Sequence, residues 1–200
     1  MSTLTVSRHF VEASLSGAER LGLDSRALLQ EAGISPDLLR IEMARVSSDQ
    51  FSKLMQVIWQ RTGDEFMGMG PRRARSGTFA TMCALVVGCQ TLEEVYQQAF
   101  RFSRLFEPMV SMELEIFGDR ARLVTRIEGS IHDPDYFLRE SILVIWHRLG
   151  SWLIGQPVEL EKAEFDYPRP DHGDEYRHIF HCPLAFESDC TALTFSKRFL

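Results

Sequence analysis

The sequence predicts an α+β fold, with a helical N-terminal half over about residues 1–106 and a small, mostly antiparallel sheet with packed helices over about 107–200. Three observations predict it. Helix-capping signals and apolar residues at helical spacing fill the first half. From about residue 109 apolar and polar residues alternate as they do in strands. Two helical patterns then interrupt the strand patterns, which gives the order ββαβαββ.

The first helices are marked by their caps. Asp24 precedes the run SRALLQEA, and Gly33 stands where a left-handed residue ends a helix. Ser47 with Gln50 three residues later forms a capping-box signature. The run FSKLMQVIWQ that follows carries apolar residues at i, i+3, i+4 and i+7, so a helix is expected there.

The stretch RTGDEFMGMGPR, residues 61–72, raises the question of a phosphate-binding loop because it holds three glycines. Such a loop follows a buried strand and ends in Lys-Ser/Thr. Here a helix precedes the glycines, and no Lys-Ser/Thr follows them. We therefore interpret Gly63 as the end of the helix.

The remaining elements follow in order. GTFATMCALVVGCQ, apolar on nearly all sides, predicts a buried helix, and Thr91 with Glu94 opens the next one. VSMELEIFGDRARLVTRIE predicts a hairpin around Gly118-Asp119. An apolar helix is expected within 135–155. ELEKAEFDYP predicts a strand, DEYRHIF a short helix, and PLAFES and TALTF two short strands.

Composition limits the function. With 22 basic and 28 acidic residues the formal net charge is −6, which argues against a dedicated nucleic-acid surface. The four cysteines contain no C-x-x-C pair, and no secretory signal or membrane span is found, so we expect free thiols in a cytoplasmic protein. Neither a cofactor nor membrane contact is expected.

The sequence argues against three kinds of chemistry. ALLQEAGISPDLLR resembles a helix-turn-helix, but its second helix offers acidic and apolar residues where a DNA reader needs basic ones. His172, His178, His181 and Cys182 lie close together without the paired spacing of a structural zinc site, so no metal is expected. No G-x-S-x-G nucleophile motif occurs, and we expect no enzyme.

A binding cavity is the remaining possibility. The apolar helices carry four polar residues inside their runs, Arg139, Glu140, His147 and Arg148. Ligand sites are mostly apolar cavities with a few placed polar groups. The alternative is that these side chains face solvent.

Several segments, taken in order, resemble a known family: ALLQEAGISPDLL, RVSSDQFSKLMQVIWQRTGDEFMGMG, TLEEVYQQAFRF, FLRESILVIWHRLGSWLIGQPVELEKAEFDYPRP and EYRHIFHCPLAFESDCTALTFSKRFL. Together they resemble the N-terminal effector and dimerisation region of AraC/XylS-type transcription regulators, in the arabinose-binding-like subgroup. The resemblance covers about residues 20–200.

The resemblance implies that residues 1–200 are one effector-sensing and dimerisation domain. It also implies a C-terminal helix-turn-helix domain in the full-length protein, through which alone DNA is bound. An unknown small-molecule effector and a homodimer are expected; the alternative is a protein-interaction module with no small-molecule ligand. The expected effector-lining residues are Met82, Phe102, Phe106, Glu140 and His147. A buried carboxylate at Glu140 would favour a cationic or hydroxyl-bearing effector.

Overall fold

The chain forms two compact units, the first made of Met1–Phe79 and Ser130–Leu138 and the second of Ala80–Gly129 and Arg139–Leu200. The structure, a computed structural model, describes residues 5–106 and 109–200, apart from the side chain of Phe106. Its helices and mostly antiparallel strands confirm the predicted α+β class. In the described part of the chain, no helix is both long and apolar enough to span a membrane.

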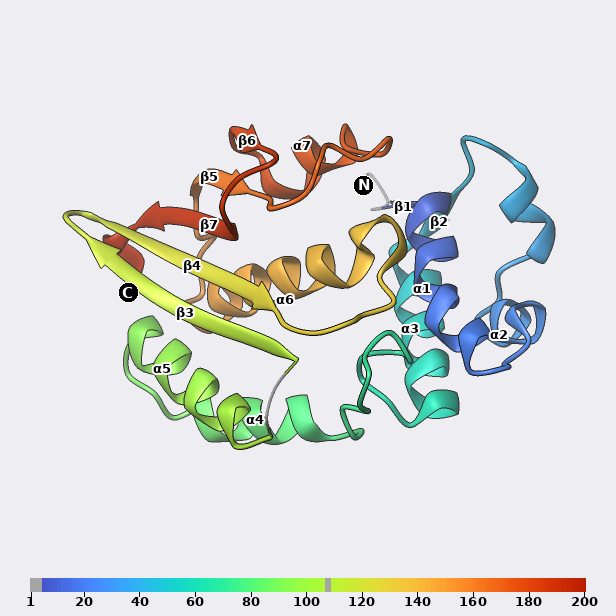
Figure 1. Cartoon of the computed structure of the whole chain (residues 1–200), viewed down its shortest axis with the longest axis horizontal. Helices are drawn as coiled ribbons and strands as arrows, with labels where there is room; N and C mark the ends of the chain where they lie inside the picture. Colours follow the sequence, from blue (N-terminus) through green and yellow to red (C-terminus); the bar gives the residue numbers. More distant parts are fainter. Residues whose placement is uncertain (1–4, 107–108) are drawn as a thin grey trace. The chain divides into compact units, whose positions relative to one another are not determined.

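The first unit is mainly helical (Figure 1). Its elements are β1 (Thr5–Ser7), α1 (Arg8–Arg20), α2 (Ser25–Glu31), η1 (Pro36–Arg40), β2 (Arg45–Ser47), α3 (Ser48–Thr62) and η3 (Pro134–Tyr136). β1 and β2 form a two-stranded antiparallel sheet with Val6 opposite Val46. The sequence did not predict this sheet, because three residues are too few to show alternation.

The caps of the first unit confirm the helix boundaries expected from the sequence. The Asp24 carboxylate accepts the backbone N–H of Arg26 at 2.9 Å at the start of α2. Ser47 and Gln50 form both hydrogen bonds of the capping box at the start of α3. Gly63 ends α3 in the left-handed region, with φ of 63°.

The stretch after α3 is organised by a buried carboxylate and not by a phosphate-binding motif. Asp64 is buried, and its oxygens accept backbone hydrogen bonds from three residues of the following loop, Phe66, Gly68 and Ala74, at 3.0, 2.9 and 2.8 Å. The charge is balanced by these N–H dipoles, which close the loop on itself. The helix-end interpretation is therefore confirmed.

Helix α1 packs directly against this loop at a glycine. A Cβ added at Gly17 would lie 2.2 Å from the carbonyl oxygen of Met67. The guanidinium of Arg20 holds the same loop by donating to the carbonyl oxygens of Gly68 and Gly70, the latter at 3.2 Å. Only a residue without a side chain permits this approach of two backbone segments.

The second unit contains the five-stranded sheet (Figure 1). Its elements are α4 (Thr78–Val86), α5 (Leu92–Ser103), η2 (Arg104–Phe106), β3 (Val110–Phe117), β4 (Arg120–Ile127), α6 (Phe137–Leu153), β5 (Leu160–Glu164), α7 (Glu175–Phe180), β6 (Leu184–Ala185), β7 (Thr191–Ser196) and η4 (Lys197–Phe199), with the first residues of α4 and α6 counted in the first unit. The strand order is β3-β4-β7-β5-β6, and the β5–β6 pair alone is parallel among the described strands. The order ββαβαββ is confirmed.

Helix α4 differs from the prediction of a buried helix. Met82 and Val86 are buried, whereas Leu85 is 58% and Val87, just after the helix, is 68% exposed. The run is apolar all round, so its periodicity carried no information on which side would be covered. The prediction of full burial was wrong, and an apolar face of this helix reaches solvent.

The glycine contact between α1 and the loop can be tested by Gly17→Ala. We expect a loss of about 2 kcal/mol in the free energy of unfolding. The added Cβ meets a backbone atom, so the loop itself must move, whereas a side chain could have rotated away. Urea unfolding followed by circular dichroism measures it. Gly88→Ala is the matched control, since its added Cβ meets no atom within 4 Å. Equal stabilities of the two variants would contradict the close packing.

Candidate effector-binding site

The five residues expected from the sequence to line an effector site occupy three helices and one 3-10 turn. Met82 is buried on α4 and Phe102 is half-buried on α5. Phe106 ends η2, and its side chain lies outside the described residues. Glu140 and His147 both lie on α6, where separate hydrogen-bond partners hold them. Glu140 and His147 therefore share a helix but not a hydrogen-bond network. Their role in effector binding stays a prediction.

Glu140 is a buried carboxylate in the first turn of α6, with 2% of its surface exposed. It accepts hydrogen bonds from His172 Nε2 at 2.7 Å and from the hydroxyl of Tyr176. The Tyr176 hydroxyl also lies 3.0 Å from that of Tyr167. Burial raises the pKa of Tyr176, and the neighbouring Glu140 charge raises it further, so the phenol stays protonated.

The four polar residues inside the apolar α6 run have different surroundings. Glu140 is buried, which excludes the solvent-facing alternative for this residue. Arg139 is half-buried and pairs with Asp166 at 3.5 Å. Arg148 is exposed, as that alternative expects. The helix therefore presents one buried acid to the interior of its unit.

His147 is half-buried, and its Nε2 lies 2.7 Å from the carbonyl oxygen of Val158. Burial lowers the pKa of His147, and the electrostatic effects of Arg148 and His181 lower it further. The hydrogen bond to Val158 acts in the opposite direction and raises the pKa. The contact ties α6 to the segment that leads into β5. These interactions give His147 a structural role in the described state.

An aromatic cluster surrounds the Tyr176 ring. Phe165 lies 4.8 Å from Tyr176 between ring centroids, and Phe186 stacks on both, at 5.1 Å from Phe165 and 5.7 Å from Tyr176. Tyr167 and Phe180 complete the cluster against Phe165 at 5.4 and 5.6 Å. The buried acid therefore sits at the polar edge of a packed aromatic group.

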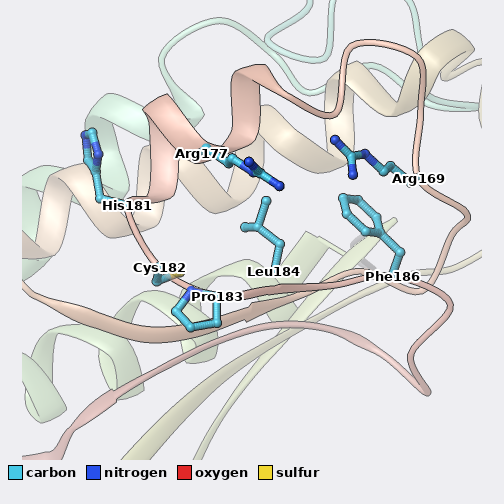
Figure 2. A pocket seen from close by; sticks show the side chains of 7 residues that line it. All are labelled: Arg169, Arg177, His181, Cys182, Pro183, Leu184 and Phe186. Carbon is cyan, nitrogen blue, oxygen red and sulfur yellow. The ribbon is translucent and has the colours of Figure 1, made fainter.

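A surface hollow of about 540 Å³ adjoins this cluster; we call it the α7–β6 hollow. Its lining residues are Arg169, Arg177, His181, Cys182, Pro183, Leu184 and Phe186 (Figure 2). The sequence analysis considered His181 and Cys182 only as possible metal ligands. Among the described residues no group of three or more potential ligands is placed to hold a metal ion. No spacing signal could have found the hollow, because α7, β6 and the loop before α7 form it together.

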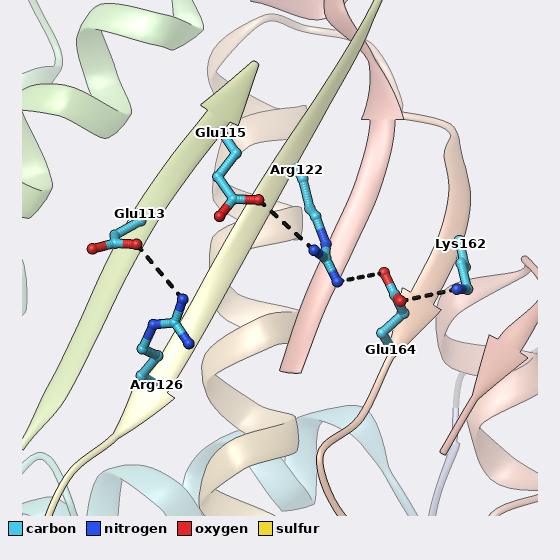
Figure 3. A network of polar contacts seen from close by, with 6 residues as sticks. All are labelled: Glu113, Glu115, Arg122, Arg126, Lys162 and Glu164. Carbon is cyan, nitrogen blue, oxygen red and sulfur yellow. Dashed lines mark hydrogen bonds and ion pairs between the residues drawn. The ribbon is translucent and has the colours of Figure 1, made fainter. Parts of the chain in front are cut away.

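A second hollow, of about 440 Å³, lies on the polar face of the sheet and is filled with paired charges. Arg122 pairs with Glu115 at 3.7 Å and with Glu164 at 2.9 Å, and Lys162 pairs with Glu164 at 2.8 Å (Figure 3). Burial acts to raise the pKa of Glu164, but Lys162 and Arg122 outweigh it and lower the pKa. Because these charges satisfy one another, this face is a weaker candidate for a ligand.

The pH dependence of stability tests the surroundings of His147. Its pKa is lower in the folded than in the unfolded chain, so the unfolded state takes up the proton first as the pH falls below about 6.5. The free energy of unfolding should therefore decrease from about pH 7 to about pH 5, and His147→Gln should reduce that decrease. Gln98→Asn, at an exposed position on α5 without a titratable group, is the control and should keep the parent slope. Identical slopes for parent and His147→Gln in urea unfolding would contradict the assignment.

The chain is similar to known transcription regulators. Residues 22–200 match the family model described as the arabinose-binding domain of AraC transcription regulators, N-terminal. The chain is also similar to the ornithine utilization regulator of Pseudomonas aeruginosa, with 22% identity over 192 residues that make up 96% of this chain. It spans 57% of the length of that relative. The chain belongs to the family of N-terminal arabinose-binding domains of AraC transcription regulators.

Proposed function

We propose that this chain is the ligand-sensing and dimerisation domain of a cytoplasmic AraC-type transcription regulator. The family match over residues 22–200 is the observation that carries the proposal. In this proposal, a C-terminal helix-turn-helix domain binds DNA. This domain would correspond to the part of the ornithine utilization regulator that the present chain does not cover. The domain itself performs no catalysis in this proposal.

The second unit contains features that suit a sensor. The α7–β6 hollow, at about 540 Å³, lies within the range of roughly 300–1,000 Å³ typical of small-molecule sites. It adjoins the cluster in which Glu140 is buried. Of the five residues expected from the sequence, Glu140 is the strongest candidate for coupling to an effector, since a buried charge responds strongly to changes around it. Direct contact of Met82, Phe102, Phe106 and His147 with an effector stays a prediction.

The alternative is a protein-interaction module without a small-molecule ligand. The exposed face of α4 favours it, because Leu85 and Val87 present apolar surface to solvent. The two functions differ in what stabilises the chain. A sensor is stabilised by a small molecule, whereas an interaction module is stabilised by another protein chain.

A thermal-shift screen tests the sensing function. The compounds are L-ornithine and L-arabinose, suggested by the names of the relative and of the family, with amines, other amino acids, other sugars and fatty acids. A ligand at about 100 times its Kd adds about 2.7 kcal/mol, which should raise Tm by roughly 5 to 10 °C. If no class raises Tm while another protein chain does, the interaction module becomes the better explanation.

Self-association is expected through α4. Residues 78–91 contain no charged side chain. In a twofold-symmetric dimer the same surface patch of each copy meets its counterpart, so an uncharged apolar patch can pair without like-charge repulsion. Leu85→Glu should weaken the dimer by about tenfold or more. Ile41→Glu is the matched control, since Ile41 is 60% and Leu85 58% exposed. Sedimentation equilibrium that shows equal weakening by both, or a monomeric parent chain, would contradict the interface.

A further inference from the structure

The α7–β6 hollow is built from three segments of the second unit. Arg169 lies in the loop between β5 and α7, and Arg177 lies on α7 itself. His181 ends α7 in the left-handed region, with φ of 52°, and turns the chain toward β6. β6 then pairs in parallel with β5 at the edge of the sheet. Helix α7 and strand β6 thus each carry a lining residue, Arg177 on one side of the hollow and Leu184 on the other.

One side of the hollow is positively charged. Figure 2 shows the guanidinium groups of Arg177 and Arg169 above the side chains of Leu184 and Phe186, with the His181 ring directed away. Arg169 pairs with the carboxylate of Asp174 at 2.7 Å. No ion pair or side-chain hydrogen bond of Arg177 is found among the residues that the structure describes.

None of the described residues that line the hollow carries a carboxylate, although the chain as a whole has a net charge of −6. Burial raises the pKa of the Cys182 thiol to about 11, so this lining group is neutral. A local excess of guanidinium attracts an anion, and its fork of N–H donors matches the two oxygens of a carboxylate. The charge of the hollow therefore selects for an anionic group near Arg177.

The other side of the hollow is apolar. Pro183, Leu184 and Phe186 form it. Phe186 is fixed from beneath, because its ring stacks on Phe165 and Tyr176 with interplanar angles of 21° and 28°. Because the Phe186 ring is already held in place, it loses little conformational entropy when a ligand covers it. An extended apolar group is the part of a ligand that would gain from this surface.

We propose that the α7–β6 hollow binds an organic monocarboxylate with an apolar chain, its carboxylate on the Arg177 guanidinium and its chain on Leu184 and Phe186. The proposal rests on the proposed sensing function and specifies its ligand class. Phe186 contacts Tyr176, which donates to Glu140 at the start of α6. A ligand on Phe186 therefore touches the group of residues that holds α6 and α7 together.

Titration of the 1–200 chain with sodium octanoate, below its micelle concentration, tests the site. Binding is followed by isothermal titration calorimetry and by ¹⁵N chemical shifts. We expect saturable binding with shifts concentrated in residues 169–186. Acetate, which has the charge without the chain, and octylamine, which has the chain with the opposite charge, should each bind more weakly by about tenfold or more.

Variants separate a specific site from general charge. Arg177→Gln should weaken octanoate binding by about tenfold or more, because a charge-assisted hydrogen bond is lost. Arg101→Gln makes the same charge change at an exposed position on α5 and should leave the affinity unchanged. Equal effects of the two variants, equal affinities for octanoate and octylamine, or shifts concentrated outside residues 169–186 would each overturn the proposal.

These outcomes are distinct from those that test the sensing function. If octanoate fails here while another compound raises Tm, the carboxylate site is wrong and the sensing function stands. If octanoate binds through Arg177 but does not change DNA binding by the full-length regulator, the site stands and the sensing function through it is wrong.

Discussion

A buried carboxylate sets the geometry of the second unit. Glu140 gives up its hydration when α6 packs, and such a loss is tolerated only where hydrogen-bond donors replace water. The donors come from His172 and Tyr176, which are 32 and 36 residues away along the chain. Helix α6, the loop before α7 and α7 must therefore meet at one point. Removing one partner of such a buried group typically costs about 3–5 kcal/mol.

The same constraint explains why the aromatic residues cluster where they do. The hydroxyl of Tyr176 binds the acid and its ring packs against Phe165 and Phe186, so one side chain serves the polar and the apolar part of the interior. The ring of Phe186 is at once part of this cluster and a wall of the α7–β6 hollow. In a sensor, a ligand at that wall would reach the buried acid through two ring contacts and one hydrogen bond.

The first unit is held by a comparable device. Asp64 is satisfied by backbone N–H groups of its own loop, and α1 approaches that loop closely enough to exclude any side chain at Gly17. The glycine-rich stretch that first suggests phosphate binding is thus part of the packing of the first unit.

The sequence by itself determined the features that depend on neighbours along the chain. The cap at Ser47, the left-handed helix end at Gly63 and the hairpin around Gly118 each need only a few adjacent residues, so the α+β class and the order of its elements could be predicted. The resemblance to the regulator family likewise lay in ordered local segments. Among the described strands, β1 and β2 were missed, because each has three residues.

Tertiary structure alone decided which faces are covered and which residues share a site. Periodicity marks α4 as apolar but does not say whether a partner covers Leu85. Glu140 could be singled out as a polar residue in an apolar run, yet its donors follow from the meeting of distant segments. Arg169 and Arg177 likewise form one hollow only because the chain turns at His181 and β6 joins the sheet. Contacts between distant segments depend on how the elements pack, and that information is not local to any stretch of the chain.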